Sequence, residues 1–119
     1  MTTEAEVTAW MEGYLAAWTS NDAADIGALF TDEAVYYTRP YGGEVWKGRD
    51  GIVAGWLEHL DESGTWTFDW HLLGIAGDRV FVRGVTEYAD FPDYDNLWVV
   101  TLTDDGRASE FTEWAVARE

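Results

Sequence analysis

A chain of 119 residues, of which 47% are hydrophobic, can bury one core, so length and composition predict a single domain over residues 1–119 and exclude a disordered chain. Its 23 acidic and 7 basic residues give a formal net charge of -16, which would repel nucleic acids and anionic membrane surfaces. Because the chain contains no cysteine, disulfides and thiolate metal sites are excluded as well.

The acidic excess has two interpretations. It favours solubility, and it is also typical of adaptation to high salt, which screens the self-repulsion. The first segment, MTTEAEVTAW, is acidic where a secretory signal is basic, and no long apolar run follows it. We therefore expect a soluble, cytoplasmic protein with no membrane or nucleic-acid partner.

Two helices are predicted at the start of the chain. Thr3 and Glu6 have the spacing of a capping box, and the apolar residues that follow recur on one helical face. That face consists of Val7, Trp10, Met11, Tyr14, Leu15 and Trp18. Asp22 can cap a second, shorter helix with Ile26, Leu29 and Phe30 on its apolar side. We expect these two helices to form a hairpin.

A short strand and a third helix come next. Residues 35–37 are typical of a strand, and Pro40 with Gly42–Gly43 predicts the turn after it. Asp50 is expected to cap a helix that ends near Ser63–Gly64. The apolar side of this helix is Val53, Trp56, Leu57 and Leu60.

From residue 65 onward the apolar period changes from 3.6 to 2. Alternation in residues 65–72 predicts a half-buried strand, and Gly77–Asp78 predicts a hairpin into a strand over 79–90. A strand over 97–103, a turn at Asp104–Gly106 and a closing strand over 108–116 complete a four-stranded antiparallel meander. The fold class predicted is α+β, with helices on one face of a curved sheet.

The order of these elements, together with the strings LFTDEAVYY, PYGG, WKGRDGI and DDGR, resembles the nuclear transport factor 2-like superfamily. That superfamily includes SnoaL-like polyketide cyclases, ketosteroid isomerases and limonene-epoxide hydrolases. The resemblance covers nearly the whole chain. It implies a cone-shaped α+β barrel in which three N-terminal helices pack on a curved antiparallel sheet that encloses an apolar pocket.

The isomerase resemblance implies a donor but no base. Tyr14 matches the oxyanion tyrosine of the first helix, whereas Thr38-Arg39-Pro40 stands where that family has its catalytic aspartate. Trp98 stands where that family has its second acid, and an indole N–H can donate but cannot act as a base. These departures argue against steroid isomerisation by that family's own mechanism.

The epoxide-hydrolase resemblance matches more positions. Tyr36 and Thr38 correspond to the residues that hold the water, although threonine replaces asparagine. Tyr88 and Asp90 correspond to the pair that handles the epoxide oxygen, although tyrosine replaces arginine. Glu113 corresponds to the carboxylate of the last strand, although glutamate replaces aspartate. The resemblance thus implies Glu113 as base, Asp90 as acid, Tyr36 and Thr38 as orienting groups, and Tyr88 as a donor.

Each of these roles has a structural alternative. Glu113 shares one strand face with Phe111, and neither face of that strand is cleanly apolar, so Glu113 faces either the pocket or solvent. Asp90 fits a turn residue beside Pro92 at least as well as an acid. The aromatic residues predicted for the pocket, which would otherwise be core, are Tyr14, Trp18, Trp56, Trp98 and Phe111.

The leading hypothesis is a cofactor-independent enzyme of cyclase, epoxide-hydrolase or isomerase type, acting by acid–base chemistry on a small apolar or aromatic molecule. The alternative is a non-catalytic ligand-binding or dimerisation domain of the same fold. No metal site is expected, because His71 is predicted on the outer face and His59 at a helix end. A homodimer through the outer sheet face, with Leu97 and Val99, is predicted.

Overall fold

The computed structural model describes residues 2–118, which form three helices and six strands. The helices are α1 (Glu4–Ser20), α2 (Ala23–Gly27) and α3 (Gly48–Glu58). The strands are β1 (Phe30–Tyr37), β2 (Val45–Lys47), β3 (Trp66–Ala76), β4 (Arg79–Tyr88), β5 (Tyr94–Leu102) and β6 (Ala108–Ala117). Within the described residues, no helix is both long and apolar enough to cross a bilayer.

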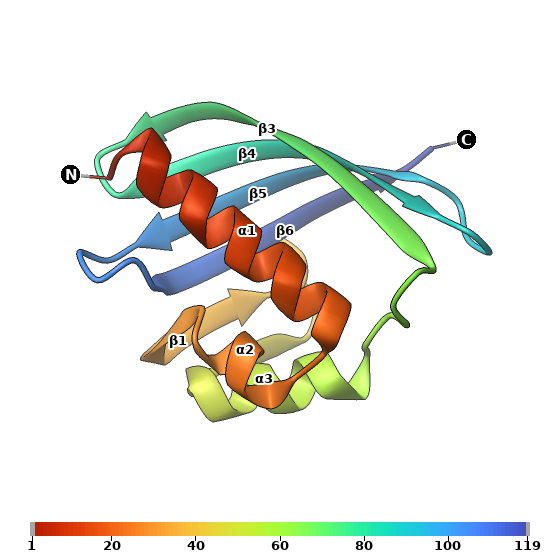
Figure 1. Cartoon of the computed structure of the whole chain (residues 1–119), viewed down its shortest axis with the longest axis horizontal. Helices are drawn as coiled ribbons and strands as arrows, with labels where there is room; N and C mark the ends of the chain where they lie inside the picture. Colours follow the sequence, from red (N-terminus) through yellow and green to blue (C-terminus); the bar gives the residue numbers. More distant parts are fainter. Residues whose placement is uncertain (1, 119) are drawn as a thin grey trace.

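The first two helices are present as predicted, except that α2 ends at Gly27, so Leu29 and Phe30 lie beyond it and Phe30 begins β1. Both hydrogen bonds of the Thr3–Glu6 capping box are present, and α1 buries its apolar stripe. It ends at Asn21, whose backbone is left-handed (φ 50). The Asp22 side chain accepts from the backbone N–H groups of Ala24 and Asp25, and so caps α2. The short link folds α2 back against α1 (Figure 1).

The bounds predicted for the third helix are wrong. Asp50 lies in the first turn of α3, whereas the helix begins at Gly48 directly after β2. Gly48 has a φ of 75, and this conformation, which favours glycine, lets a strand turn into a helix without a loop. The helix ends at Glu58 with His59 as its C-cap, and the segment expected to continue it to Ser63–Gly64 is an irregular link to β3.

The sheet contains the predicted meander and two more strands. Its order is β2-β1-β6-β5-β4-β3, and the pairs among β3, β4, β5 and β6 are antiparallel. Strand β1 pairs in parallel with β6, and β2 pairs antiparallel with β1. The sheet is therefore mixed and open. Strand β1 also begins earlier than predicted, at Phe30, because a register irregularity between Phe30 and Val35 accommodates the polar residues between them.

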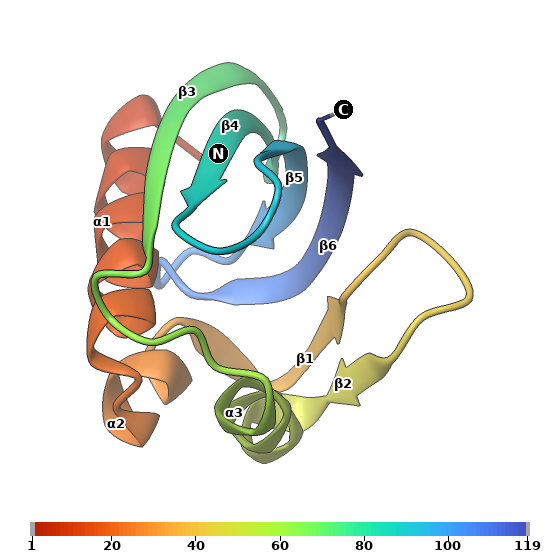
Figure 2. The same ribbon diagram turned by 90° about the vertical axis from the view of Figure 1, so that its right-hand side faces the viewer.

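The sheet curves around a space that α1 and α3 cover from two sides (Figures 1 and 2). One end of this space is filled by core side chains. Trp10 of α1 contacts the rings of Phe30 and Phe111, and its indole N–H donates to the carbonyl oxygen of Leu29 at 3.0 Å. The main cavity lies toward the other end of α1, where Tyr14 and Trp18 line it.

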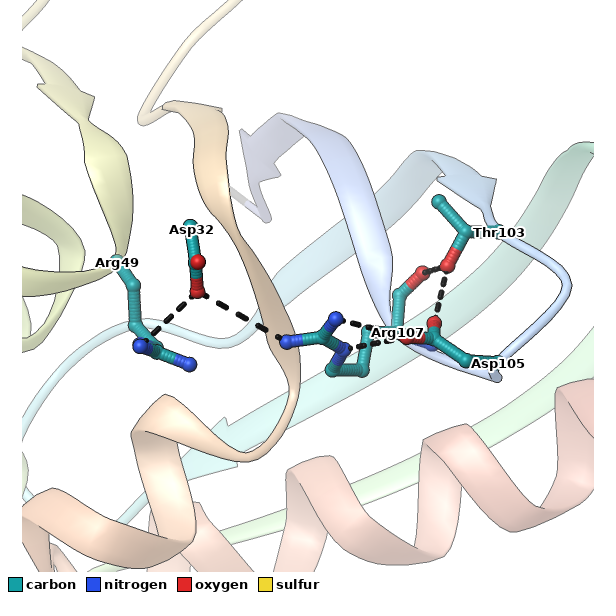
Figure 3. Close-up of polar contacts among 5 residues, drawn as sticks. All are labelled: Asp32, Arg49, Thr103, Asp105 and Arg107. Carbon is teal, nitrogen blue, oxygen red and sulfur yellow. Dashed lines mark hydrogen bonds and ion pairs between the residues drawn. The ribbon is translucent and has the colours of Figure 1, made fainter.

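An exposed network of polar side chains connects the start of β1 with α3 and with the β5–β6 turn (Figure 3). Asp32 of β1 pairs with Arg49 of α3 at 2.9 Å and lies 4.0 Å from Arg107, which follows the β5–β6 turn. Arg107 also pairs with Asp105 at 2.7 Å, and its hydrogen bonds, with that of Thr103, lower the pKa of Asp105 to about 2. The network ties α3, which forms one wall of the cavity, to the sheet.

Candidate functional site

A cavity of about 450 Å³ lies between α1, the end of α3 and the concave face of the sheet. Its wall is mostly aromatic, as expected for a site that takes a flat apolar molecule. The aromatic residues that line it are Tyr14, Trp18, Tyr36, Trp46, Trp56, Tyr88, Phe91, Tyr94 and Trp98. Four of the five residues predicted for the pocket are among them. The fifth, Phe111, lies beneath the cavity, fully buried and stacked on Tyr36 at 4.3 Å between ring centroids.

Glu113 faces this cavity from β6. Its register partner on β5 is Trp98, whose indole N–H donates to Glu113 Oε2 at 2.7 Å. The side-chain amide of Asn96, two residues earlier on the same face of β5, donates to the same oxygen at 3.1 Å. Within residues 2–118 no hydrogen bond reaches Oε1, which is therefore available to a ligand or a water molecule.

The orientation of the Asn96 amide is set by a third strand. The Thr86 hydroxyl of β4 donates to Asn96 Oδ1 at 2.8 Å, so the NH₂ group of that amide points to Glu113. Thr86 and Asn96 are 1% and 7% exposed, so this chain of hydrogen bonds is largely shielded from bulk solvent. The chain crosses three strands and positions the Glu113 carboxyl group.

Burial among the aromatic rings raises the pKa of Glu113 to about 7, while the hydrogen bonds from Asn96 and Trp98 act in the opposite direction. At neutral pH both the carboxylate and the carboxylic acid are therefore populated. A group of this kind can accept a proton in one step and return it in the next.

A pair of hydroxyl groups faces the same carboxyl. The Tyr14 and Tyr36 oxygens are 2.8 Å apart, and both side chains are buried. Burial is the largest cause that raises the pKa of each tyrosine, and the nearby charge of Glu113 raises both further. Both groups thus remain protonated. Since one hydroxyl donates to the other, one proton of the pair remains for an oxygen atom in the cavity.

A second carboxylate lines the cavity at Asp61, in the link between α3 and β3. Its Oδ2 accepts from the Trp18 indole N–H at 3.1 Å and from the Tyr88 hydroxyl at 3.5 Å. The Asn21 side chain donates to the Asp61 carbonyl oxygen and accepts from the Trp56 indole N–H. These contacts hold the link against the end of α1. Nothing in the sequence pattern distinguished Asp61 from the other acidic residues of this segment.

Two of the predicted catalytic residues are not brought to the main cavity. Asp90 is exposed in the turn that follows β4 and does not line the cavity, although Phe91 and Tyr94 after it do, so the predicted Asp90–Glu113 pair does not form. The Thr38 hydroxyl donates to the carbonyl oxygen of Glu44 at 2.7 Å and so closes the β1–β2 turn. Thr38 lines a smaller neighbouring cavity of about 330 Å³, which Glu113 also reaches.

Both histidines lie where they were predicted. His71 is exposed on the outer face of β3, and His59 is the C-cap of α3. The His59 side chain lies 3.2 Å from Glu44 at the edge of the cavity. Together with Glu58, these two side chains have ligand atoms within 4.8 Å of one another. All three residues are exposed, so the group offers no enclosed coordination shell.

The comparisons agree with this architecture. The family model of the SnoaL-like domain matches residues 11–118, so the chain belongs to the SnoaL-like family, within the nuclear transport factor 2-like superfamily. No curated protein sequence matches it significantly.

Solved structures share the fold at low identity. An NTF-2 like protein of unknown function from Burkholderia xenovorans LB400 has a TM-score of 0.76 at 15% identity, over 98% of this chain and 87% of that one. A ketosteroid isomerase-like protein from Erwinia carotovora atroseptica SCRI1043 has a TM-score of 0.67 at 19% identity, over 96% of both chains. A steroid delta-isomerase from Pseudomonas aeruginosa has a TM-score of 0.66 at 16% identity, over 98% and 83%. These likenesses concern the fold, and chemistry must be argued from the site.

Proposed function

We propose that the protein is a cofactor-independent enzyme in which Glu113 transfers a proton to or from a small apolar or aromatic substrate. The observation that carries this proposal is the Glu113 carboxyl group, which has a pKa of about 7 in an aromatic cavity and an unengaged oxygen. A buried carboxyl poised near neutral pH is the property that general acid–base catalysis requires.

The tyrosine pair supplies the second half of the mechanism. When the Glu113 carboxylate takes a proton from a carbon next to a carbonyl, negative charge develops on the carbonyl oxygen. The free proton of the Tyr14–Tyr36 pair stabilises that oxygen, and Glu113 then returns its proton at another position of the substrate. The same groups suit a hydrolytic step, in which Glu113 takes the proton of a water molecule and the tyrosines bind the leaving oxygen.

The isomerase-type reaction is the first to test, because two of the structural neighbours described above are named for it and because it needs one carboxyl group rather than two. The base would then lie on β6 rather than before the turn proline, where this chain has Thr38-Arg39-Pro40. Hydrolysis of an apolar epoxide is the second reaction. It needs an acid besides Glu113, and the tyrosine pair would have to provide it.

The test is an assay of the Glu113→Gln variant with β,γ-unsaturated ketones, followed by the absorbance of the conjugated product, and with apolar epoxides, followed by diol formation. We expect turnover to fall about 100-fold or more, since general acid–base catalysis contributes at least that much. Glu110→Gln is the matched control, because Glu110 lies on the same strand but does not line the cavity. Full activity in Glu113→Gln would remove Glu113 from the mechanism.

The alternative is a binding domain without chemistry, favoured by the aromatic wall alone. Proton exchange separates the two functions. A ligand that binds in the cavity and carries an acidic C–H group should exchange that hydrogen with D₂O in the presence of the wild-type protein and not with Glu113→Gln. Binding without exchange in the wild-type protein would support the binding domain.

A further inference from the structure

The main cavity is lined by two carboxyl groups and by one histidine, His59, which is paired with Glu44. Among residues 2–118, no lysine or arginine lines this cavity, whereas Glu113 and Asp61 do. Arg39 lines the smaller neighbouring cavity and not the main one. The whole chain carries a formal charge of -16, so its surface adds to this field rather than opposing it. An anionic ligand would enter the cavity against this potential, and a cationic one with it.

The Asp61 end of the cavity also has the aromatic geometry that suits a cation. The rings of Phe91 and Tyr94 both stand at 89° to the ring of Tyr88, with centroids 5.9 Å and 6.0 Å away. Both contacts are edge-to-face, so these rings pack on one another, and all three line the cavity, where the negative face of an aromatic ring attracts a cation within about 6 Å. Asp61, which accepts from the Tyr88 hydroxyl, lines the same cavity as these rings.

The two ends of the cavity therefore differ in chemistry. At the β6 end, Glu113 and the Tyr14–Tyr36 pair move protons and bind oxygen. At the other end, a carboxylate and three aromatic rings come together without a lysine or arginine, and the nearby His59 side chain is paired with Glu44.

We propose that the ligand of this cavity carries a positively charged nitrogen, a tertiary or quaternary ammonium group, which binds between the Asp61 carboxylate and the rings of Tyr88, Phe91 and Tyr94. Its apolar body lies toward Glu113. This inference deepens the proposed function and rests on it for the identity of the cavity as the substrate site, because it names the class of substrate.

The test is a binding comparison by intrinsic tryptophan fluorescence. Benzyltrimethylammonium and neopentylbenzene have the same shape and differ in one positive charge, so their ratio of affinities measures recognition of the cation. We expect the ammonium compound to bind about tenfold more tightly than its neutral isostere, and phenylacetate, an anion, to bind more weakly than both.

Two variants locate the effect. Asp61→Asn keeps an oxygen that accepts from Trp18 and Tyr88, so it should fold, and we expect most of the preference for the cation to be lost. Phe91→Leu changes a side chain that is 67% exposed and should weaken binding of the cation more than that of the isostere. Glu62→Gln is the matched control for general attraction, because Glu62 is exposed and does not line the cavity.

Equal affinity for the charged and neutral compounds would overturn the inference, as would a preference that survives in Asp61→Asn or falls equally in Glu62→Gln. These outcomes are separate from those of the proposed function. If Glu113→Gln abolishes turnover while no cation is preferred, proton transfer stands and the inference falls. If the cation is preferred while Glu113→Gln stays active, the inference about the ligand stands and the role of Glu113 falls.

Discussion

Replacing Glu113 with glutamine should make the protein more stable at neutral pH while it removes the proposed catalytic group. Glutamine keeps the length of the side chain and an oxygen that can accept from Asn96 and Trp98. It removes the negative charge that the wild-type protein must hold in an aromatic cavity above the pKa of Glu113. The variant thus isolates the energetic cost of that charge.

The size of the effect follows from the pKa of Glu113. Burial raises it from 4.5 to about 7, and each pKa unit corresponds to 1.36 kcal/mol, so the ionised group costs roughly 3 kcal/mol. The folded state binds the proton more tightly than the unfolded state. The stability of the wild-type protein is therefore highest, with respect to this group, below pH 4.5, and it is lost as the pH rises through about 7.

The assay is urea unfolding followed by tryptophan fluorescence, at a series of pH values from below 4.5 to above 7. The difference in unfolding free energy, variant minus wild type, should rise across this interval by roughly 3 kcal/mol and then stay constant. Glu110→Gln should show no such rise. A difference that does not depend on pH would refute the argument that the Glu113 charge is held at a cost.

Three further predictions concern the fold. Thr3→Ala should destabilise the protein by about 1 kcal/mol in thermal or urea unfolding, because it removes the hydroxyl that accepts from the backbone N–H of Glu6 in the α1 capping box, and an unchanged midpoint would contradict this. Gly55→Ala should destabilise the protein by about 1–3 kcal/mol, because a Cβ atom at this position overlaps the Trp46 ring. In the same helix, a Cβ atom at Gly51 meets nothing within 4 Å, so Gly51→Ala should be neutral or stabilising. Equal effects of the two changes would disprove the overlap. We also propose that two copies of the chain pair through the outer sheet face, where the Trp114 side chain is 45% exposed. Trp114→Glu should then convert a dimer to a monomer in sedimentation experiments. A wild-type protein that is monomeric across micromolar concentrations would contradict the proposal.

Much of the fold was predictable because its signals are local. The capping box, the helical stripe and the alternation from Trp66 onward each depend on neighbouring residues, and the structure contains all three. The parallel β1–β6 pair was not predictable in this way, since it joins segments far apart in the chain. Strand β2 was missed because three residues are too few to show a period.

The site was predictable in part. The aromatic lining was among the expectations, but the sequence left open whether Glu113 faces the pocket or solvent, and the choice between the two faces of β6 needed the register with Trp98. Asn96 was missed because the strand was expected to begin one residue later, although extending the alternation back from Trp98 would have placed it on the inner face. Asp61 was missed because it lies in an irregular link, where no period exists.

The parallel pairing of β1 with β6 has a consequence for the order of folding. Val35 lies beside Glu110, whereas each hairpin of the meander joins neighbouring segments. Contacts of large sequence separation form slowly, because the chain between them must be ordered first. The meander and α1 should therefore assemble early, and β1, which brings Tyr36 to the cavity, should dock late. The capacity to bind a ligand would then appear only in the slowest phase of refolding, after most of the secondary structure has formed.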